Sequence, residues 1–312
     1  MKIKFQSRAK NAFLTLELVI VMIIAISLMG ASMIAGRKML KSADVSRIIS
    51  EYETLSQGII QFYGAKNRIP GDIPLAEMGG NLNSTILQAN VSKISVGCTA
   101  NKCITASGQI TGIKAVTAFQ EMASAGLISD NLASISYTIA SSNACLASTT
   151  ENFYTLRNKL IPGSRYSKQA SWILGMDSSL STENLSPANS VIYNPTIYPT
   201  FNGKPRLILF NASNYRGTGG VTCEVDVANT NAAFMGSGAV SPDIAYEIDI
   251  KIDDGLPSLG WIVSENDRNA LQKCTDGLLD ATTNVSTRKY TNSDANNGKE
   301  GCVMTFLINI LA

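Results

Sequence analysis

The sequence predicts an α+β fold in which a long N-terminal helix packs on a globular domain with an antiparallel sheet. Three observations lead to this prediction. Residues 18–36 carry no charge, as in a helix that spans a membrane. Apolar residues from Val45 to Phe62 then recur at the three- and four-residue spacing of an amphipathic helix. Later in the chain, short β-branched and aromatic runs alternate with Asn, Ser and Gly, as in an antiparallel sheet.

The helix is predicted to run from about Phe13 to Tyr63, because no proline interrupts this stretch. Its first half, 13–36, includes nineteen uncharged residues that would span about 28 Å, close to the thickness of a bilayer core. Its second half, 37–63, is amphipathic and would cover the globular domain, 64–312. A secretory signal peptide is the competing interpretation, although the apolar core of such a peptide is shorter, about 7 to 15 residues.

The globular domain is predicted to contain two further helical regions and several strands. The stretch YGAKNRIPGDIP, 63–74, ends the long helix because Pro-Gly-Asp is typical of a turn. A helix is predicted over 114–128, with Gly126 near its end. The stretch 240–262 alternates like a strand, yet it has the Ser-Pro-Asp start and the Gly255 stop of a helix. Strands are predicted at 92–96, 169–176, 190–198, 206–212, 220–227, 259–264 and 302–310.

The composition excludes several functional classes. The chain contains no histidine, so it cannot by itself build a Ser-His-Asp or Cys-His catalytic site or a histidine-ligated metal site. Its net charge of +2 depends on four basic residues before Phe13, and without them 22 basic residues face 24 acidic ones. No basic surface for nucleic acid is therefore expected. We expect neither an enzyme nor a nucleic-acid-binding protein.

Six cysteines all follow the apolar segment. Their even number, the absence of a C-x-x-C pair and the absence of histidine favour disulfides in an oxidising compartment over a metal site. The connectivity stays open, and buried free thiols are the alternative. Two pairings are natural: one would close a small loop, and the other would hold the C-terminal tail with a loop-entropy contribution of about 3.5 kcal/mol. The small loop would join Cys98 and Cys103, the tail pair would be Cys274 and Cys302, and the remaining two are Cys145 and Cys223.

The stretch AFLTLELVIVMIIAISLMGAS, 12–32, resembles the N-terminal signature of type IV prepilins and type II secretion pseudopilins. In that family a short basic leader ends at a small residue, a Phe follows, and a Glu lies four residues after the Phe. Here these are the leader 1–12, Ala12, Phe13 and Glu17, with Ala12 standing where the family usually has Gly. The resemblance implies a pilin-like fold, cleavage between Ala12 and Phe13 by a membrane prepilin peptidase, and N-methylation of Phe13.

The resemblance also implies a location and partners. The precursor would cross the bacterial inner membrane once, with its globular domain in the periplasm. It would meet the peptidase, an inner-membrane assembly platform and other pilin or pseudopilin subunits, and end in a type IV pilus or a type II secretion pseudopilus. The large domain favours a minor subunit, and a similar Asp-x-Lys-x-Asp-Asp-Gly stretch in large prepilin-like proteins favours a helix over 240–262. The alternative is a membrane-anchored surface adhesin or binding module that is not assembled into a filament.

Glu17 raises a physical question, because an ionised carboxylate inside hydrocarbon is costly. In a filament core of packed apolar helices, Glu17 of one subunit would neutralise the free amine of Phe13 on its neighbour. Two charges that are each costly alone would then form one pair, which favours a single axial register. The alternative is a glutamate that snorkels to the membrane interface.

Four aspartates form the remaining candidate site. Asp249, Asp253 and Asp254, together with Asp294 in an Asn-rich loop, are predicted as possible oxygen ligands for calcium. The resemblance supports this idea, since several pseudopilins bind calcium in a C-terminal loop. The spacing is not that of an EF-hand, however, and Asp-Asp-Gly is typical of a turn. We favour the turn, and no other cofactor is expected.

Overall fold

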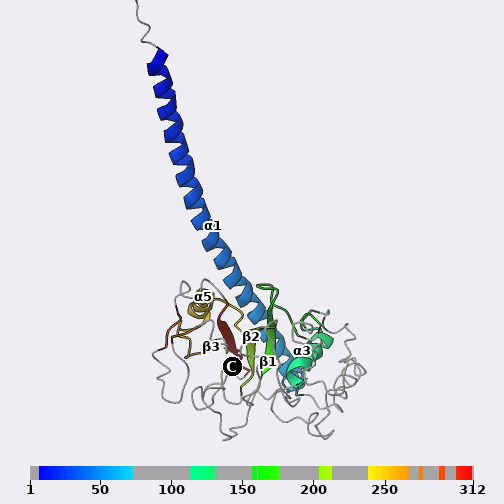
Figure 1. Ribbon diagram of the computed structural model, residues 1–312. Helices are drawn as coiled ribbons and strands as arrows, with labels where there is room; N and C mark the ends of the chain where they lie inside the picture. Colours follow the sequence, from blue (N-terminus) through cyan, green and yellow to red (C-terminus); the bar gives the residue numbers. More distant parts are fainter. Residues whose placement is uncertain are drawn as a thin grey trace, which may run out of the picture. The chain divides into compact units, whose positions relative to one another are not determined.

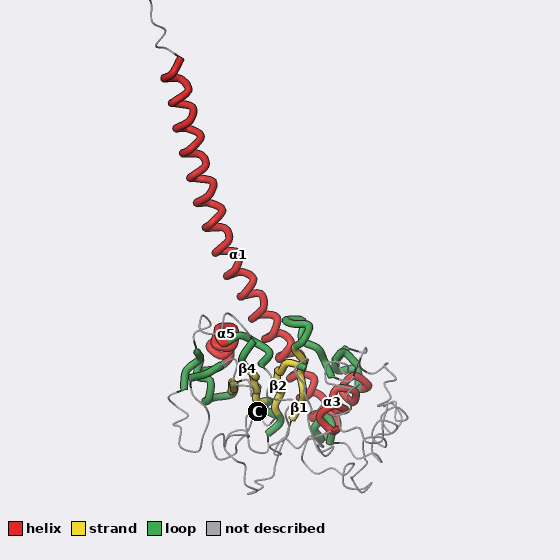
Figure 2. The backbone as a smooth tube through the Cα atoms, in the orientation of Figure 1, coloured by secondary structure: helices red, strands yellow, loops and turns green. Residues whose placement is uncertain are grey.

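The computed structural model of the chain describes residues 7–72, 113–129, 132, 157–159, 161–175, 204–212, 238–266, 274–276, 288–291 and 300–310 (Figure 1). The chain divides into two compact units, Met1–Ser46 and Arg47–Ala312. Among the described residues, the first unit consists of the first part of helix α1. The second holds the rest of α1, the helices α3 and α5, and a sheet of four strands (Figure 2).

Helix α1 runs from Ser7 to Lys66. It ends where the backbone of Asn67 turns into the left-handed region, with φ of 52°, and the Asn67 N–H donates to the Tyr63 carbonyl at 2.7 Å. A turn at Pro70 and Gly71 follows, and proline would not allow the helix to continue. The predicted long helix is thus confirmed as one continuous element that extends past both of its expected ends.

The sheet consists of β1 (Ala170–Gly175), β2 (Arg206–Asn211), β3 (Ile262–Asn266) and β4 (Cys302–Leu307). Its order is β1-β2-β4-β3, and every neighbouring pair is antiparallel, as predicted. All residues of the four strands are buried, so both faces of the sheet are covered. In the strand order, β4 lies inside the sheet, between β2 and β3.

Four of the seven predicted strands correspond to β1, β2, β3 and β4, and the other three lie outside the described residues. The prediction at 259–264 begins too early. Residues 259–261 form a turn instead, because Gly260 adopts a φ of 77° and the Leu259 N–H donates to the Leu256 carbonyl. The prediction at 302–310 runs three residues past the end of β4 at Leu307.

The second half of α1 packs on this sheet. Ile48, Leu55, Ile59 and Phe62 are buried, at the three- and four-residue spacing that the sequence shows. The Tyr52 ring stacks on the ring of Phe306 in β4, with centroids 4.9 Å apart, and the Tyr52 hydroxyl donates to the Leu307 carbonyl at 3.0 Å. The helix thus contributes one wall of the hydrophobic core.

A buried carboxylate fixes this packing. Glu51 in α1 accepts a hydrogen bond at 2.9 Å from the indole N–H of Trp172 in β1, and another at 2.7 Å from the backbone N–H of Arg165. The Arg165 side chain also lies 3.3 Å from the Glu51 carboxylate. Because Trp172 is only 1% exposed, loss of the carboxylate would leave its N–H without this partner in the core.

Helix α3 (Ile113–Ser124) packs against α1 at Gly58. A Cβ at Gly58 would lie 2.8 Å from the Met122 Cε atom, so glycine permits this close approach. The helix ends as predicted near Gly126, whose φ is 71°. Gly126 donates to the Ala123 carbonyl and Leu127 to that of Met122, which are the two hydrogen bonds of a Schellman motif.

The ambiguous stretch 240–262 contains the predicted helix, α5, which runs from Pro242 to Ile252. Pro242 occupies its first turn, and Gly255, with φ of 77°, follows its end. Apolar residues occupy every second position here, as in a strand, because the helix carries apolar side chains on two of its faces. Ile244 and Ile248 are buried, whereas Tyr246 and Ile250 are 44% and 51% exposed.

Candidate assembly segment and aspartate cluster

The apolar part of α1 offers a continuous uncharged surface. Within the described residues, one helix is long and apolar enough to span a membrane, and its apolar window is not buried inside the chain. We call residues 18–36 the apolar segment. Its large side chains are exposed on every side of the helix, from Leu18 at 62% to Ile34 at 63%. A helix that is apolar all round needs lipid or other helices to cover it.

The polar groups of the apolar segment are satisfied within the helix. The segment contains two hydroxyl side chains, those of Ser27 and Ser32. Ser27 donates to the Ile23 carbonyl and Ser32 to the Leu28 carbonyl, each at 2.8 Å. These bonds to the preceding turn leave no hydroxyl donor that requires water, which suits a segment in hydrocarbon.

Glu17 is exposed at the start of the apolar segment. The backbone of α1 includes the predicted cleavage residues Ala12 and Phe13, but their side chains lie outside the described part of the chain. The structure therefore places the carboxylate at the predicted edge of the segment. The pairing of Glu17 with an amine of another subunit stays a prediction.

The structure brings three of the four predicted aspartates together at the end of α5. One carboxylate oxygen of each of Asp249, Asp253 and Asp254 lies within 4.8 Å of the others. Asp249 belongs to the last turns of the helix, Asp253 is its C-cap, and Asp254 follows in the turn that contains Gly255. The fourth, Asp294, lies outside the described residues.

Each aspartate accepts hydrogen bonds from the surrounding protein. Asp253 Oδ2 accepts from the backbone N–H groups of Trp261 and Ile262, the latter at 2.8 Å, and so ties the turn to the start of β3. Asp254 Oδ1 accepts from the Leu256 N–H at 2.8 Å. These contacts are the ones that a structural turn requires.

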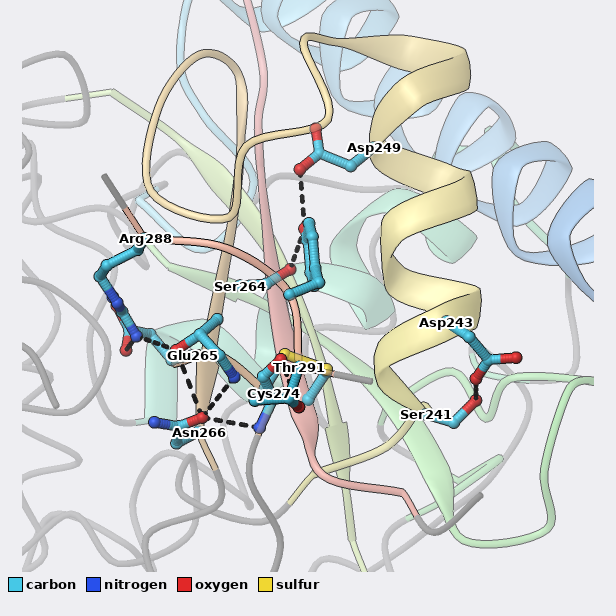
Figure 3. The surroundings of a disulfide bond; sticks show 12 residues. Ser241, Asp243, Asp249, Ser264, Glu265, Asn266, Cys274, Arg288 and Thr291 are labelled. Carbon is cyan, nitrogen blue, oxygen red and sulfur yellow. Dashed lines mark hydrogen bonds and ion pairs between the residues drawn. A yellow bond between two sulfur atoms is a disulfide. The ribbon is translucent and has the colours of Figure 1, made fainter. Parts of the chain in front are cut away.

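Asp249 is fully buried and contacts a residue that is distant in the sequence. It accepts the hydroxyl of Tyr290 at 2.7 Å and the backbone N–H of Gly255 at 3.3 Å. The Tyr290 hydroxyl also lies 2.9 Å from Ser264 Oγ in β3, so a polar chain joins α5 to the sheet (Figure 3). A local reading of the sequence misses Tyr290, since it lies 41 residues from its partner.

Burial changes the acid–base properties of this group. Burial, together with the neighbouring Asp253 carboxylate, raises the pKa of Asp249 to about 7, against the lowering effect of the Tyr290 hydrogen bond. Burial also raises the pKa of Asp253, while its two backbone N–H donors act in the opposite direction. The pKa of Tyr290 is raised by burial and by the adjacent Asp249 carboxylate.

The predicted calcium site stays a prediction, because Asp294 lies outside the described residues. Calcium takes about six to eight oxygens, and the described part of the chain gathers three carboxylates here. Two of these carboxylates already accept at least two hydrogen bonds each. The geometry therefore supports the predicted turn without requiring a metal.

Of the predicted disulfide cysteines, Cys274 and Cys302 are bonded to each other, with an S–S distance of 2.02 Å. The other four, Cys98, Cys103, Cys145 and Cys223, lie outside the described residues. The bond joins the first residue of β4 to the segment 274–276, which Asn266 at the end of β3 also holds (Figure 3). This pairing is therefore confirmed.

A buried ion pair stands beside the disulfide. Arg288 is 2% exposed, and its guanidinium lies 3.3 Å from the Glu265 carboxylate and 3.0 Å from Ser258 Oγ. It also donates to the Thr275 hydroxyl. No sequence pattern in this stretch signals the pair, because 23 residues separate its two members.

The chain was compared with family models, with curated proteins and with solved structures, and no match was found. We therefore infer the function from the residues themselves, above all from the apolar segment with Glu17 at its start and from the buried second half of the same helix.

Proposed function

We propose that this protein is a prepilin-like subunit that is assembled through the apolar segment into a type IV pilus or a type II secretion pseudopilus. Its leader, 1–12, would be removed by a prepilin peptidase between Ala12 and Phe13, and Phe13 would be N-methylated. The size of the second unit, Arg47–Ala312, which we call the body, favours a minor subunit. Its partners would be the peptidase, an inner-membrane assembly platform and other pilin or pseudopilin subunits.

One observation carries the proposal: the two halves of a single helix have opposite environments. Residues 18–36 are apolar, exposed all round and internally hydrogen-bonded, whereas residues 47–66 belong to the body and bury Ile48, Ile59 and Phe62 in it. A helix that only anchored a domain would need the first property. A helix that also builds a filament needs its apolar half to be covered by copies from other subunits, and its body to stay folded outside.

Glu17 would then select the register of assembly. After cleavage the new N-terminus at Phe13 carries a positive charge, and N-methylation keeps that charge. Burying this amine alone in an apolar core would cost several kcal/mol, roughly the penalty of one desolvated ion. The Glu17 carboxylate of a neighbour would remove most of that penalty, so subunits that dock out of register would be disfavoured.

The experiment substitutes Glu17 by glutamine, which keeps its size and removes its charge. The matched control is Glu53→Gln, on an exposed glutamate in the second half of the same helix. For both variants, mass spectrometry should find the mature N-terminus at a methylated Phe13. Sheared or crosslinked filaments should lack the Glu17→Gln subunit and contain the Glu53→Gln subunit at the wild-type level.

Two results would contradict the proposal. A mature N-terminus other than Phe13 in the wild-type protein would remove the prepilin interpretation. Normal incorporation of Glu17→Gln without any wild-type copies would show that the carboxylate only lies at the interface. A membrane-anchored binding module is the second candidate function, favoured by a cavity that Tyr246 and Tyr290 line, and it would give no filament fraction for any variant.

A further inference from the structure

The outer face of α5 forms one side of a cavity of about 540 Å³ in the body of the protein. The other sides are the turn after the helix and the segment 289–291. The cavity is within the usual size range of ligand sites, about 300 to 1,000 Å³. Its lining combines apolar and aromatic side chains with three charged ones: Pro242, Asp243, Tyr246, Ile250, Asp254, Gly255, Leu256, Lys289, Tyr290 and Thr291.

Apolar groups in this cavity are left uncovered in the folded chain. Tyr246 and Ile250, one turn apart on α5, are 44% and 51% exposed, although the same helix buries Ile244 and Ile248. The Tyr246 ring meets the edge of Tyr290, with centroids 5.8 Å apart and planes at 61°. An exposed aromatic and aliphatic pair within a concave surface is typical of a binding site.

The wall opposite α5 is held in place by hydrogen bonds and the disulfide. Tyr290 donates to the buried Asp249, and Thr291 donates from its backbone N–H to the Cys274 carbonyl at 2.9 Å. Cys274 is in turn bonded to Cys302 in β4. The aromatic wall is therefore preformed and does not need a ligand to order it.

Charged groups lie toward both ends of α5. Asp243 is in the first turn of the helix and Asp254 follows its end, so roughly 13 Å of helix axis separates Asp243 from the last helical residue, Ile252. Lys289 lies on the opposite wall. Two carboxylates against one ammonium, with the Asp249 and Asp253 carboxyl groups within 4.8 Å of the Asp254 carboxylate, make the site favourable for a cation.

We propose that this cavity binds an extended polypeptide segment that carries an apolar residue between two basic ones. One cation would pair with Asp243 and the other with Asp254, and the apolar residue would lie on Tyr246 and Ile250. A separation of roughly 13 Å corresponds to about four residues of extended chain, which a single small cation does not span. Arginine suits both ends, because its guanidinium pairs with carboxylates and stacks on aromatic rings.

The test uses the full-length protein in detergent and a synthetic probe. The probe is an acetylated, amidated pentapeptide with arginine at both ends and leucine and serine between them, labelled for fluorescence anisotropy. A matched peptide with citrulline in place of both arginines keeps the shape and removes the charges. We expect the citrulline peptide to bind at least about tenfold more weakly, and the binding of the arginine peptide to weaken as salt is added.

Variants of the protein locate the site. Asp254→Asn keeps an oxygen acceptor for the Leu256 N–H and should weaken binding about tenfold. Tyr246→Ala should weaken it to a similar degree, whereas Glu53→Gln, the same charge change on α1, should have no effect. Lys289→Gln removes the one cation of the lining and should tighten binding, a gain that a folding defect would not produce.

Three outcomes would overturn the proposal. Equal binding of the arginine and citrulline peptides would show that charge is not recognised. Equal weakening by Asp254→Asn and Glu53→Gln would show a general electrostatic effect. Binding of arginine amide as tight as that of the pentapeptide would show that the site takes one small cation, not a polypeptide. None of these results depends on whether the protein is assembled into a filament.

Discussion

Two isoleucines in the same helix have opposite environments. Ile26, in the apolar segment, is 68% exposed, whereas Ile59, in the second half of α1, is completely buried. The first segment is apolar on all sides and finds no cover within its own unit, while the second is apolar on one side and packs on a sheet. Apolar composition alone therefore does not tell where a helix is buried; the distribution of the apolar residues around the helix does.

The polar groups of the two regions differ in the same way. Ser27 and Ser32 bond to carbonyls four residues away, so the apolar segment is self-contained. Glu51 and Tyr52, by contrast, reach partners 121 and 255 residues away in β1 and β4. The hydroxyl bonds of the first region therefore stay within its own helix, whereas the polar contacts of the second join it to the sheet.

The largest effect is expected from truncating the two isoleucines separately. Ile59→Ala should lower the free energy of unfolding of the body by about 4 kcal/mol, because it leaves a cavity in the core. Ile26→Ala should change it by less than about 0.5 kcal/mol. Urea unfolding of the detergent-solubilised chain, followed by the fluorescence of the buried Trp172, measures both values. Similar losses for the two variants would remove the distinction between the regions.

Removing the disulfide should destabilise the body and leave the apolar segment unchanged. The double variant Cys274→Ala with Cys302→Ala should lose about 3.5 kcal/mol, from the entropy of a loop with a sequence separation of 28. The helical circular dichroism that persists in urea should be the same in both proteins, since the segment bonds only within its own helix. An unchanged midpoint of unfolding would show that the bond adds no stability.

The pH dependence of stability should trace to the body, through Asp249. Its pKa is raised to about 7 in the folded protein from the ordinary value of 3.8, so the folded state holds the proton more tightly. The resulting stability is fully present below about pH 4 and is lost as the pH rises through 7, at up to about 1.4 kcal/mol for each pH unit between these values. Asp249→Asn should flatten this decline. A decline that is equally steep in the variant would assign it to other groups.

The smallest contrast concerns two glycines of α1. A Cβ at Gly58 would come within 2.8 Å of Met122 Cε, while a Cβ at Gly36 would meet nothing within 4 Å. Gly58→Ala should cost about 1 kcal/mol, because crowding against α3 outweighs the gain in helix propensity. Gly36→Ala should not lower stability. Thermal melts of the two variants measure the difference, and a stabilising Gly58→Ala would mean that α3 shifts without cost.

The sequence by itself determined those features that depend on near neighbours along the chain. The 3.6-residue period and the uncharged run predicted α1 and its two halves, and the turn residues predicted its end near Pro70. Pro242 and Gly255 were compatible with the helix α5. The Cys274–Cys302 bond was one of several pairings that the sequence left open.

Only the tertiary structure decided which groups meet across long separations. The strand-like alternation of α5 left helix and strand open, and packing on the sheet selected the helix that exposes Tyr246 and Ile250. Glu51 with Trp172, and Asp249 with Tyr290, share no local pattern because their members come from different elements. Burial then sets their chemistry, since a carboxyl group that loses water depends on the donors that the fold places beside it.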